Sequence, residues 1–381
     1  MSDDKPRAKQ VWFLPWADLK EPLNLGKCSI WPVNSDSLAE HFEPDVSTHL
    51  ANYFRSYVDH GGNPVNTIAV CSYSNRGVSR MREDEIADLK LVVDILSFCV
   101  ISKGYRVFLR NKQNQHASAD RFKLICQSFI PGNNWLAVSS GRTLSGGWTI
   151  GQITFSRPWC VGGPFQKVDQ RLFDAFEPLF AKGFDKDSKA RFAKSLEWFR
   201  LAQTDSEDVS PENKIVMLAT AIESLLAVPK DFPNKQLWIA RWLDENCTYS
   251  ASIKKTWRGA DPGEHSAIGY WARSFYDLRN SIVHGDTART LWYASDAGTR
   301  LGHLHVATLV YWECLTRKLF QAGSFADVRK IADGISLEDN DDRRHILMTL
   351  LDASDIHRAL GWLPTLNQEI AANSATKQAS S

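Results

Sequence analysis

The chain has 381 residues, of which 43% are hydrophobic and 23% are charged. These proportions are those of an ordinary globular protein and exclude intrinsic disorder, a collagen-like repeat or a coiled coil as the main architecture. The 45 lysines and arginines are balanced by 44 aspartates and glutamates, so the net charge is +1. The whole molecule therefore has no electrostatic reason to coat DNA or an anionic membrane, and any nucleic-acid contact should be local. At about 100 to 200 residues per domain, the length predicts two or three domains.

Three features of the sequence bear on the cellular location of the protein: the start of the chain, its apolar stretches and its cysteines. The first ten residues lack the charged-then-apolar order of a signal peptide. The longest apolar stretch, 91–101, is interrupted by Asp94 and is much shorter than the ~20 residues of a membrane span. The 7 cysteines are scattered singly, with neither a C-x-x-C pair nor the Cys/His spacing of a zinc site. We therefore expect a cytoplasmic protein with reduced thiols, no metal, no cofactor and no membrane partner.

Short apolar runs rich in β-branched and aromatic residues dominate residues 1–183. They predict strands at 11–14, 67–70, 105–109 and 135–138, a hairpin turn at Gly146-Gly147, and a further strand at 148–155. Three helices are expected: one from the capping box at 37–40, one from about Ile86 to Gly104, and one from Lys167 to Lys182. Residues 1–183 should therefore form a mixed α+β domain, to which we assign a sensing or regulatory role.

Helical periodicity replaces the strand pattern after residue 184. Five helices and no strands are predicted, at about 190–203, 211–228, 235–246, 266–284 and 299–321. Ser210-Pro211 is a good helix start, and Gly285 a good helix stop. Residues 184–325 should form an all-α helical bundle, so the fold class is an α+β domain followed by a bundle. We expect a short helical extension over 326–366, including a helix at 345–351, and a disordered tail over 367–381.

The end of the fourth predicted helix carries the residues that point most clearly to chemistry. It reads LRNSIVHG over 278–285 and separates Arg279 from His284 by four residues. Histidine can transfer a proton near neutral pH, and arginine can stabilise the charge that builds on phosphorus during phosphodiester cleavage. On a helix the two side chains lie about 140° apart, so one helix cannot easily close a site on one phosphate. Two copies related by a two-fold axis could share such a site.

The spacing of this pair is not specific by itself. The same Arg-x4-His spacing occurs at Arg55/His60 and at Arg300/His305. On spacing alone, the simpler interpretation is an exposed arginine and a capping histidine near a helix C-terminus, where the helix dipole favours positive charge.

The surrounding helices supply a context that the other two pairs lack. The predicted order over about 185–325 is a helix, a polar loop, a second helix with an acidic residue, a short third helix, LRNSIVHG and a long last helix. This order resembles the HEPN family (higher eukaryotes and prokaryotes nucleotide-binding), in its Apea-like branch. In that family an arginine, usually a polar residue, and a histidine four to six residues after the arginine end a core helix. Arg279, Asn280 and His284 match this motif, and Glu223 matches the acidic residue often found on the second helix.

The resemblance implies a homodimeric, metal-independent endoribonuclease of toxin, anti-phage defence or stress-response systems. The nucleophile would be the 2′-hydroxyl of RNA, which leaves a 2′,3′-cyclic phosphate. We expect His284 to transfer the proton, Arg279 to stabilise the phosphorane and Asn280 to position the substrate. Glu223 would support the site or pair with an arginine across the bundle. The alternative is a non-catalytic module that dimerises or binds a nucleotide, with an N-terminal domain that binds a ligand or a protein.

The nearly neutral charge limits how RNA can be bound. Each phosphate contact needs its own cation, so we expect recognition of a short single-stranded element or loop, and no DNA partner. A basic run with an aromatic residue offers candidates for RNA contact: Lys254, Lys255, Trp257 and Arg258. Such a run could grip the backbone and stack a base, or it could be a solvated loop around a buried tryptophan.

Overall fold

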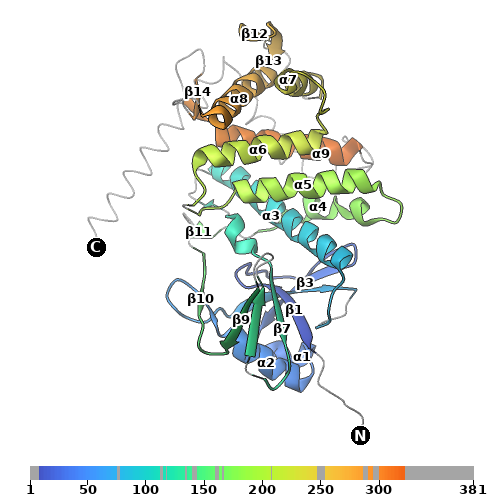
Figure 1. Ribbon diagram of the computed structural model, residues 1–381, viewed down its shortest axis with the longest axis vertical. Coiled ribbons are helices and arrows are strands. Elements are labelled where there is room, and N and C mark those ends of the chain that lie inside the picture. The colour runs from blue at the N-terminus through green and yellow to red at the C-terminus, as the bar shows by residue number, and fades with distance from the viewer. Residues whose placement is uncertain are drawn as a thin grey trace, which may run out of the picture. The chain divides into compact units, whose positions relative to one another are not determined.

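The structure is a computed structural model that describes residues 8–321 apart from short gaps (Figure 1). The gaps are 75–77, 112–114, 117, 134, 140–143, 159–162, 165–166, 207, 247–253, 286–290 and 295–299. The chain divides into two compact units. Unit 1 takes the described residues up to Gly104, those of 115–184, and Gln203–Ser206, and unit 2 takes the remainder. The sequence features expected beyond residue 321, the helical extension and the disordered tail, lie outside the described residues.

Unit 1 is built on a seven-stranded sheet in the order β2-β3-β5-β1-β7-β8-β9, in which all neighbouring strands are antiparallel. The strands are β1 (Lys9–Leu14), β2 (Leu23–Leu25), β3 (Cys28–Asn34), β5 (Thr67–Tyr73), β7 (Ile125–Phe129), β8 (Trp135–Ser139) and β9 (Leu144–Thr149). Five consecutive residues of β5 are buried, which means that both faces of the sheet are covered there. Two parallel pairs accompany the sheet: β4 (Tyr57–Val58) with β10 (Phe155–Ser156), and β6 (Gln115–His116) with β11 (Gly163–Pro164).

An aromatic cluster joins the sheet to helix α2 (Pro44–Phe54), which follows the short helix α1 (Leu38–His41). Pro44 occupies the first turn of α2, where a missing N–H costs nothing. The Phe13 ring of β1 is fully buried and contacts the rings of Tyr53, Phe54 and Tyr57 at centroid distances of 5.8, 5.1 and 5.2 Å. This cluster is the centre of the unit 1 core.

Several predicted elements of the first 183 residues have different limits in the structure. Helix α3 (Glu83–Asn111) continues through Gly104, so the helix stop and the strand predicted at 105–109 are wrong. A glycine inside a helix costs only about 1 kcal/mol relative to alanine, and the almost continuously buried stretch 91–102 offsets that cost. The predicted hairpin at Gly146-Gly147 is also wrong, because both glycines lie inside β9.

The remaining differences in this region concern short helices and one strand. The strand predicted at 148–155 ends at Thr149, before Gly151, which has φ +91°. The helix predicted from Lys167 to Lys182 is two pieces, α4 (Gln170–Asp174) and the 3-10 turn η3 (Glu177–Phe180). The helix expected from Ser37 is only the four residues of α1, and the Ser37 hydroxyl instead bonds to the backbone of Asn34.

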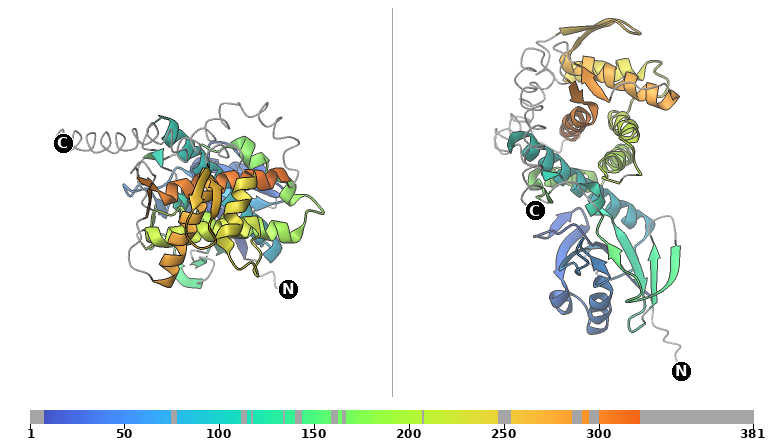
Figure 2. Two further views of the ribbon diagram at one scale, coloured as in Figure 1. Left: turned by 90° about the horizontal axis from the view of Figure 1, so that it is seen from above. Right: turned by 90° about the vertical axis from the view of Figure 1, so that its left-hand side faces the viewer.

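The described residues of unit 2 include five helices close to the predicted positions. They are α5 (Lys186–Ala202), α6 (Pro211–Leu226), α7 (Lys235–Asn246), α8 (Ala267–His284) and α9 (His303–Gln321). Figures 1 and 2 show α5 and α6 side by side. The Ser195 hydroxyl of α5 donates to the Ala221 carbonyl oxygen of α6 at 2.8 Å and lies 2.8 Å from the Tyr311 hydroxyl of α9. These buried polar contacts fix the three helices to one another.

The expectation that no strand follows residue 184 is wrong. Unit 2 also holds two antiparallel two-stranded sheets, one of β12 (Lys254–Trp257) with β13 (Gly263–Ser266), the other of β14 (Trp292–Ala294) with β15 (Arg300–Gly302). The β12–β13 hairpin packs against α8 and lies at the edge of unit 2 next to α7 (Figures 1 and 2). The described chain is therefore a mixture of helices and strands throughout. Within the described residues, no helix combines the length and the apolar character that a membrane span needs.

Candidate functional site

Both ends of helix α8 are set by local sequence signals. The Ser266 hydroxyl accepts a hydrogen bond from the Gly269 N–H at 3.2 Å and so caps the first turn. Gly285 ends the helix at φ +74°, in the left-handed region that glycine tolerates best. The last two turns of α8 therefore carry the predicted catalytic residues Arg279, Asn280 and His284.

The structure brings two of these three residues together. Arg279 is half-buried, and its Nη1 donates to Asn280 Oδ1 at 3.1 Å. Its Nε is buried and has no hydrogen-bond partner among the described residues. His284 is exposed at the last helical position, next to Val283, and no hydrogen bond joins it to Arg279 or Asn280. Within one chain, the guanidinium and the imidazole are thus not in direct contact.

Glu223 lies near the end of α6. It forms an ion pair with Lys235, with Oε2 3.6 Å from Nζ, and not with the arginine that the sequence suggested. The buried Tyr276 of α8 donates its hydroxyl proton to the Ala219 carbonyl oxygen of α6 at 3.1 Å. Burial raises the pKa of Tyr276; the Glu223 charge raises it further and the Arg279 charge lowers it. The charges of Glu223 and Arg279 therefore both affect the Tyr276 hydroxyl, whose hydrogen bond joins α8 to α6.

The candidates for RNA contact lie in β12 and in the turn after it. Lys255 is buried, with Nζ 5.5 Å from the centre of the Tyr270 ring. The Trp257 ring lies 5.5 Å from the Tyr270 ring and 5.2 Å from the buried Arg273 guanidinium. Lys255 and Trp257 thus hold the hairpin on α8, which argues against a role in stacking a base. Arg258 is exposed, and the side chain of Lys254 lies outside the described residues.

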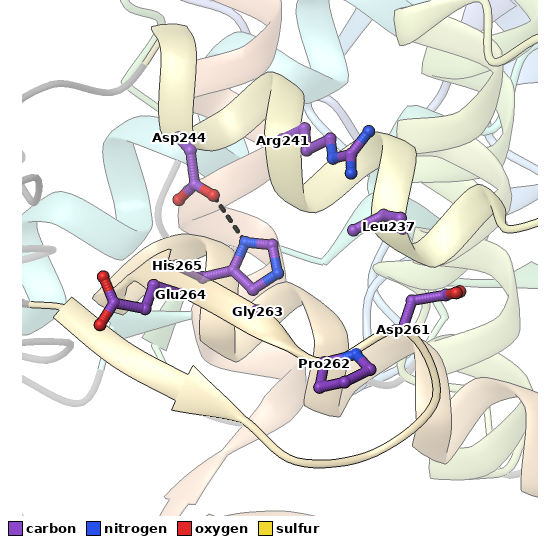
Figure 3. A pocket seen from close by; sticks show the side chains of 8 residues that line it. All are labelled: Leu237, Arg241, Asp244, Asp261, Pro262, Gly263, Glu264 and His265. Atoms are coloured by element: carbon purple, nitrogen blue, oxygen red, sulfur yellow. Dashed lines mark hydrogen bonds and ion pairs between the residues drawn. The ribbon is translucent and has the colours of Figure 1, made fainter.

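A pocket of about 430 Å³ lies between α7 and the β12–β13 hairpin (Figure 3). Its lining residues are Leu237, Arg241, Asp244, Asp261, Pro262, Gly263, Glu264 and His265. His265 Nδ1 lies 2.6 Å from Asp244 Oδ2, and the other oxygen of this carboxylate accepts from the Ser266 N–H at 2.9 Å and from the Ser266 hydroxyl. No sequence pattern indicates this pair, because its members are 21 residues apart and neither belongs to a recognised spacing.

The Asp244 carboxylate is packed against the start of α8 in a way that can be tested. A Cβ on Gly269 would lie 2.3 Å from Asp244 Oδ1. Glycine-to-alanine changes inside helices usually stabilise by up to about 1 kcal/mol. We expect Gly269→Ala instead to destabilise the protein by about 1–3 kcal/mol, because the carboxylate must move away from Ser266 and His265. Urea denaturation would measure this change.

Gly263→Ala is the matched control, because nothing lies within 4 Å of a Cβ built at this position of β13. It should change the free energy of unfolding by less than about 0.5 kcal/mol. A Gly269→Ala variant that is as stable as the wild type, or more so, would show that Asp244 is not held where the structure places it.

Comparison with known proteins yields no match to a protein-family model, a curated protein or a solved structure. Among the described residues, no group of three or more His, Cys, Asp or Glu side chains is placed to hold a metal ion.

Proposed function

We propose that this chain is a metal-independent endoribonuclease of the HEPN type, with helices α5 to α9 as its HEPN-like bundle. The observation that carries the proposal is the end of α8. There Arg279 and Asn280 form a half-buried, hydrogen-bonded pair, and His284 is exposed on the last helical residue. A guanidinium held in place and an accessible imidazole are the two groups that this cleavage of an RNA phosphodiester uses.

The proposed reaction uses no group from outside the RNA and the protein. The 2′-oxygen forms a bond to the adjacent phosphorus, its proton is taken up by a base, and the bond to the 5′-oxygen breaks with protonation of that oxygen. The products are a 2′,3′-cyclic phosphate and a 5′-hydroxyl. His284 transfers the proton, Arg279 stabilises the phosphorane, and Asn280 is a positioning residue that holds the guanidinium through its 3.1 Å hydrogen bond.

A second copy of the chain completes the site in this proposal. Arg279 and His284 lie about 140° apart around one helix, so a single α8 does not close around one phosphate. A two-fold axis near Gly285 would bring an arginine and a histidine from each copy to one cleft. The exposed Val283, 51% accessible beside His284, is consistent with such a contact. The biological setting proposed with it is a toxin, anti-phage or stress-response system.

The test is cleavage of a short single-stranded RNA by the full-length chain in excess EDTA. We expect RNA fragments that end in 2′,3′-cyclic phosphate, and no cleavage of DNA with the same sequence. An RNA that carries one 2′-deoxyribose at the cleaved position should remain intact, because it lacks the nucleophile. Cleavage that stops in EDTA, or that also occurs in DNA, would contradict the proposal.

The second candidate is a non-catalytic dimerising or nucleotide-binding module. One observation favours it: no hydrogen bond links His284 to Arg279 or Asn280 within one chain. In that case RNA stays intact in the presence of the protein, and alanine at Arg279 or His284 has no effect on its biological phenotype. Substitutions at the dimer contact would alter that phenotype.

A further inference from the structure

The pocket between α7 and the β12–β13 hairpin is separate from the residues at the end of α8 that carry the proposed nuclease. Its floor is His265, which is 3% exposed. Its rim is formed by exposed residues of α7 and of the hairpin, among them Arg241 and Asp261. Its volume of about 430 Å³ falls within the roughly 300–1,000 Å³ of small-molecule sites.

The Asp244 contacts fix which nitrogen of His265 carries a proton. An ionised carboxylate only accepts hydrogen bonds, so the Nδ1 atom that lies 2.6 Å from Asp244 Oδ2 must be the donor. In the neutral imidazole, the lone pair is then on Nε2. Two further donors from Ser266 hold the carboxylate in place, so both the ring orientation and the tautomer are determined before any ligand arrives.

The Nε2 atom of His265 is the unexplained feature of the pocket. It is buried and has no hydrogen-bond partner among the described residues. An unsatisfied buried acceptor costs about 1–3 kcal/mol, and a hydrogen-bond donor on a ligand would recover that free energy. Figure 3 shows Nε2 on the side of the ring where Leu237, Arg241 and Asp261 lie. A ligand in the pocket would donate an O–H to it from that side.

The charges around this nitrogen differ from one part of the pocket to another. Arg241 supplies a guanidinium from α7, and the described residues hold no ion-pair partner for it within 4.0 Å. Asp261, held by a hydrogen bond from the Asn234 amide, and Glu264 supply carboxylates from the hairpin. A bare anion would be repelled by these carboxylates. A ligand with an anionic group at one end and several hydroxyl donors at the other can satisfy both kinds of group.

We propose that this pocket binds a phosphorylated sugar, with its phosphate on the Arg241 guanidinium and a sugar hydroxyl donating to His265 Nε2. Asp261 accepts from a second hydroxyl, and Asp244 is a positioning residue that keeps the lone pair of His265 directed at the ligand. The ligand is either a free sugar phosphate or the 5′-terminal ribose phosphate of an RNA strand, which share this chemistry. The site does not depend on the proposed nuclease.

The experiment is calorimetric titration of the full-length chain with ribose 5-phosphate. We expect saturable binding with a Kd of about 1 mM or tighter. Ribose and inorganic phosphate, which each lack one half of the recognised pattern, should bind at least about tenfold more weakly. A long-range ¹H–¹⁵N spectrum should show His265 in the Nδ1–H tautomer, with the Nε2 resonance shifted by ribose 5-phosphate.

Arg241→Gln should weaken the binding of ribose 5-phosphate by about tenfold or more, because it removes a charge-assisted hydrogen bond. Arg241 is exposed on α7, so the variant should fold normally. Arg55→Gln is the matched control: it removes an exposed arginine of unit 1 that does not line the pocket, and it should leave binding unchanged. The His284→Ala variant should also bind normally, which keeps this result independent of the nuclease.

RNA with and without a 5′-phosphate distinguishes the two sources of the ligand. Binding of 5′-phosphorylated RNA that is tighter than that of ribose 5-phosphate, and is lost in Arg241→Gln, supports the site with RNA as its ligand. Weaker binding of that RNA supports a free sugar phosphate. The proposal is overturned if ribose 5-phosphate does not bind, if inorganic phosphate binds equally well, or if Arg241→Gln and Arg55→Gln have the same effect.

Discussion

Replacing His284 by alanine should lower the rate of RNA cleavage by about 10²–10⁴-fold, the usual contribution of a general acid–base group. The fold should be unaffected, because His284 is exposed at the end of α8 and the helix is terminated by the backbone of Gly285. Arg279→Ala should cost about 10²–10³-fold, because it removes the charge that stabilises the phosphorane. Initial rates on a short RNA in EDTA, with circular dichroism as the folding check, would measure both.

His60→Ala is the matched control for this prediction. His60 is exposed and belongs to a second Arg-x4-His pair with the same spacing. The substitution therefore removes an equivalent imidazole from unit 1. It should leave the rate of cleavage unchanged. A loss of less than tenfold in His284→Ala would rule out the proton-transfer role of this residue, whatever cleaves the RNA.

Mixing the Arg279→Ala and His284→Ala variants tests whether two chains contribute to one catalytic cleft. An Arg279→Ala chain paired with a His284→Ala chain gives a dimer with one intact arginine and one intact histidine. Partial recovery of cleavage is expected in the mixture and in neither variant alone. Separate, self-sufficient sites in each chain would give no recovery.

Helix limits in unit 2 could be predicted because their signals are local. Ser210 accepts from the Asn213 N–H at 3.2 Å, as the Ser-Pro pair suggested, and Gly285 ends α8 with a positive φ. Both depend only on residues within one turn of the helix end. The start of α6 and the end of α8 could therefore be predicted correctly without knowledge of the rest of the chain.

Glycine in the first 183 residues was a poorer guide, because the same residue is compatible with several backbone conformations. Gly104 lies inside α3 and Gly146 inside β9, although both were predicted to end an element. Which role a glycine takes is decided by the burial of its neighbours, and burial depends on residues far away in the sequence. The β12–β13 hairpin was missed for the same reason: Lys255 and Trp257 form a strand because they pack on Tyr270 of α8.

Whether each candidate site could be predicted also depends on how far apart its residues lie in the sequence. Arg279, Asn280 and His284 are neighbours in sequence, so their shared place on α8 could be predicted. The Asp244–His265 pair could not, because it forms only when the hairpin folds back on the end of α7. The burial of Arg273 beneath Trp257 also follows from this hairpin, whose turn carbonyls at Ala260 and Asp261 accept from that guanidinium.

Acid should destabilise the protein through His303, the first residue of α9. Its side chain is 2% exposed and lies against the rings of Trp271 and Phe275, at centroid distances of 6.2 and 5.8 Å. Burial lowers the pKa of His303 from 6.5 to about 4. A charge in the first turn of α9 would also be opposed by the helix dipole. The folded chain therefore keeps this imidazole neutral at a pH at which the unfolded chain has protonated it.

The sign of the effect follows from proton binding. Between pH 6.5 and pH 4 the unfolded state binds a proton at His303 that the folded state does not, so acid favours unfolding. The contribution of this residue is fully present above pH 6.5 and is lost as the pH falls to about 4. A difference of this size corresponds to about 3 kcal/mol in the free energy of unfolding. Urea denaturation at several pH values between 7.5 and 4.5 would measure it.

Carboxylates also titrate in this range, so the informative quantity is the difference between wild type and His303→Gln. The variant should be less stable than wild type at neutral pH, because it replaces a packed ring, but its stability should fall by about 2–3 kcal/mol less between pH 7.5 and pH 4.5. His60→Gln, at an exposed position, should retain the full slope of the wild type. Equal slopes in wild type and His303→Gln would mean that the ring of His303 is accessible to water in solution, and that α9 does not begin against Trp271 as the structure has it.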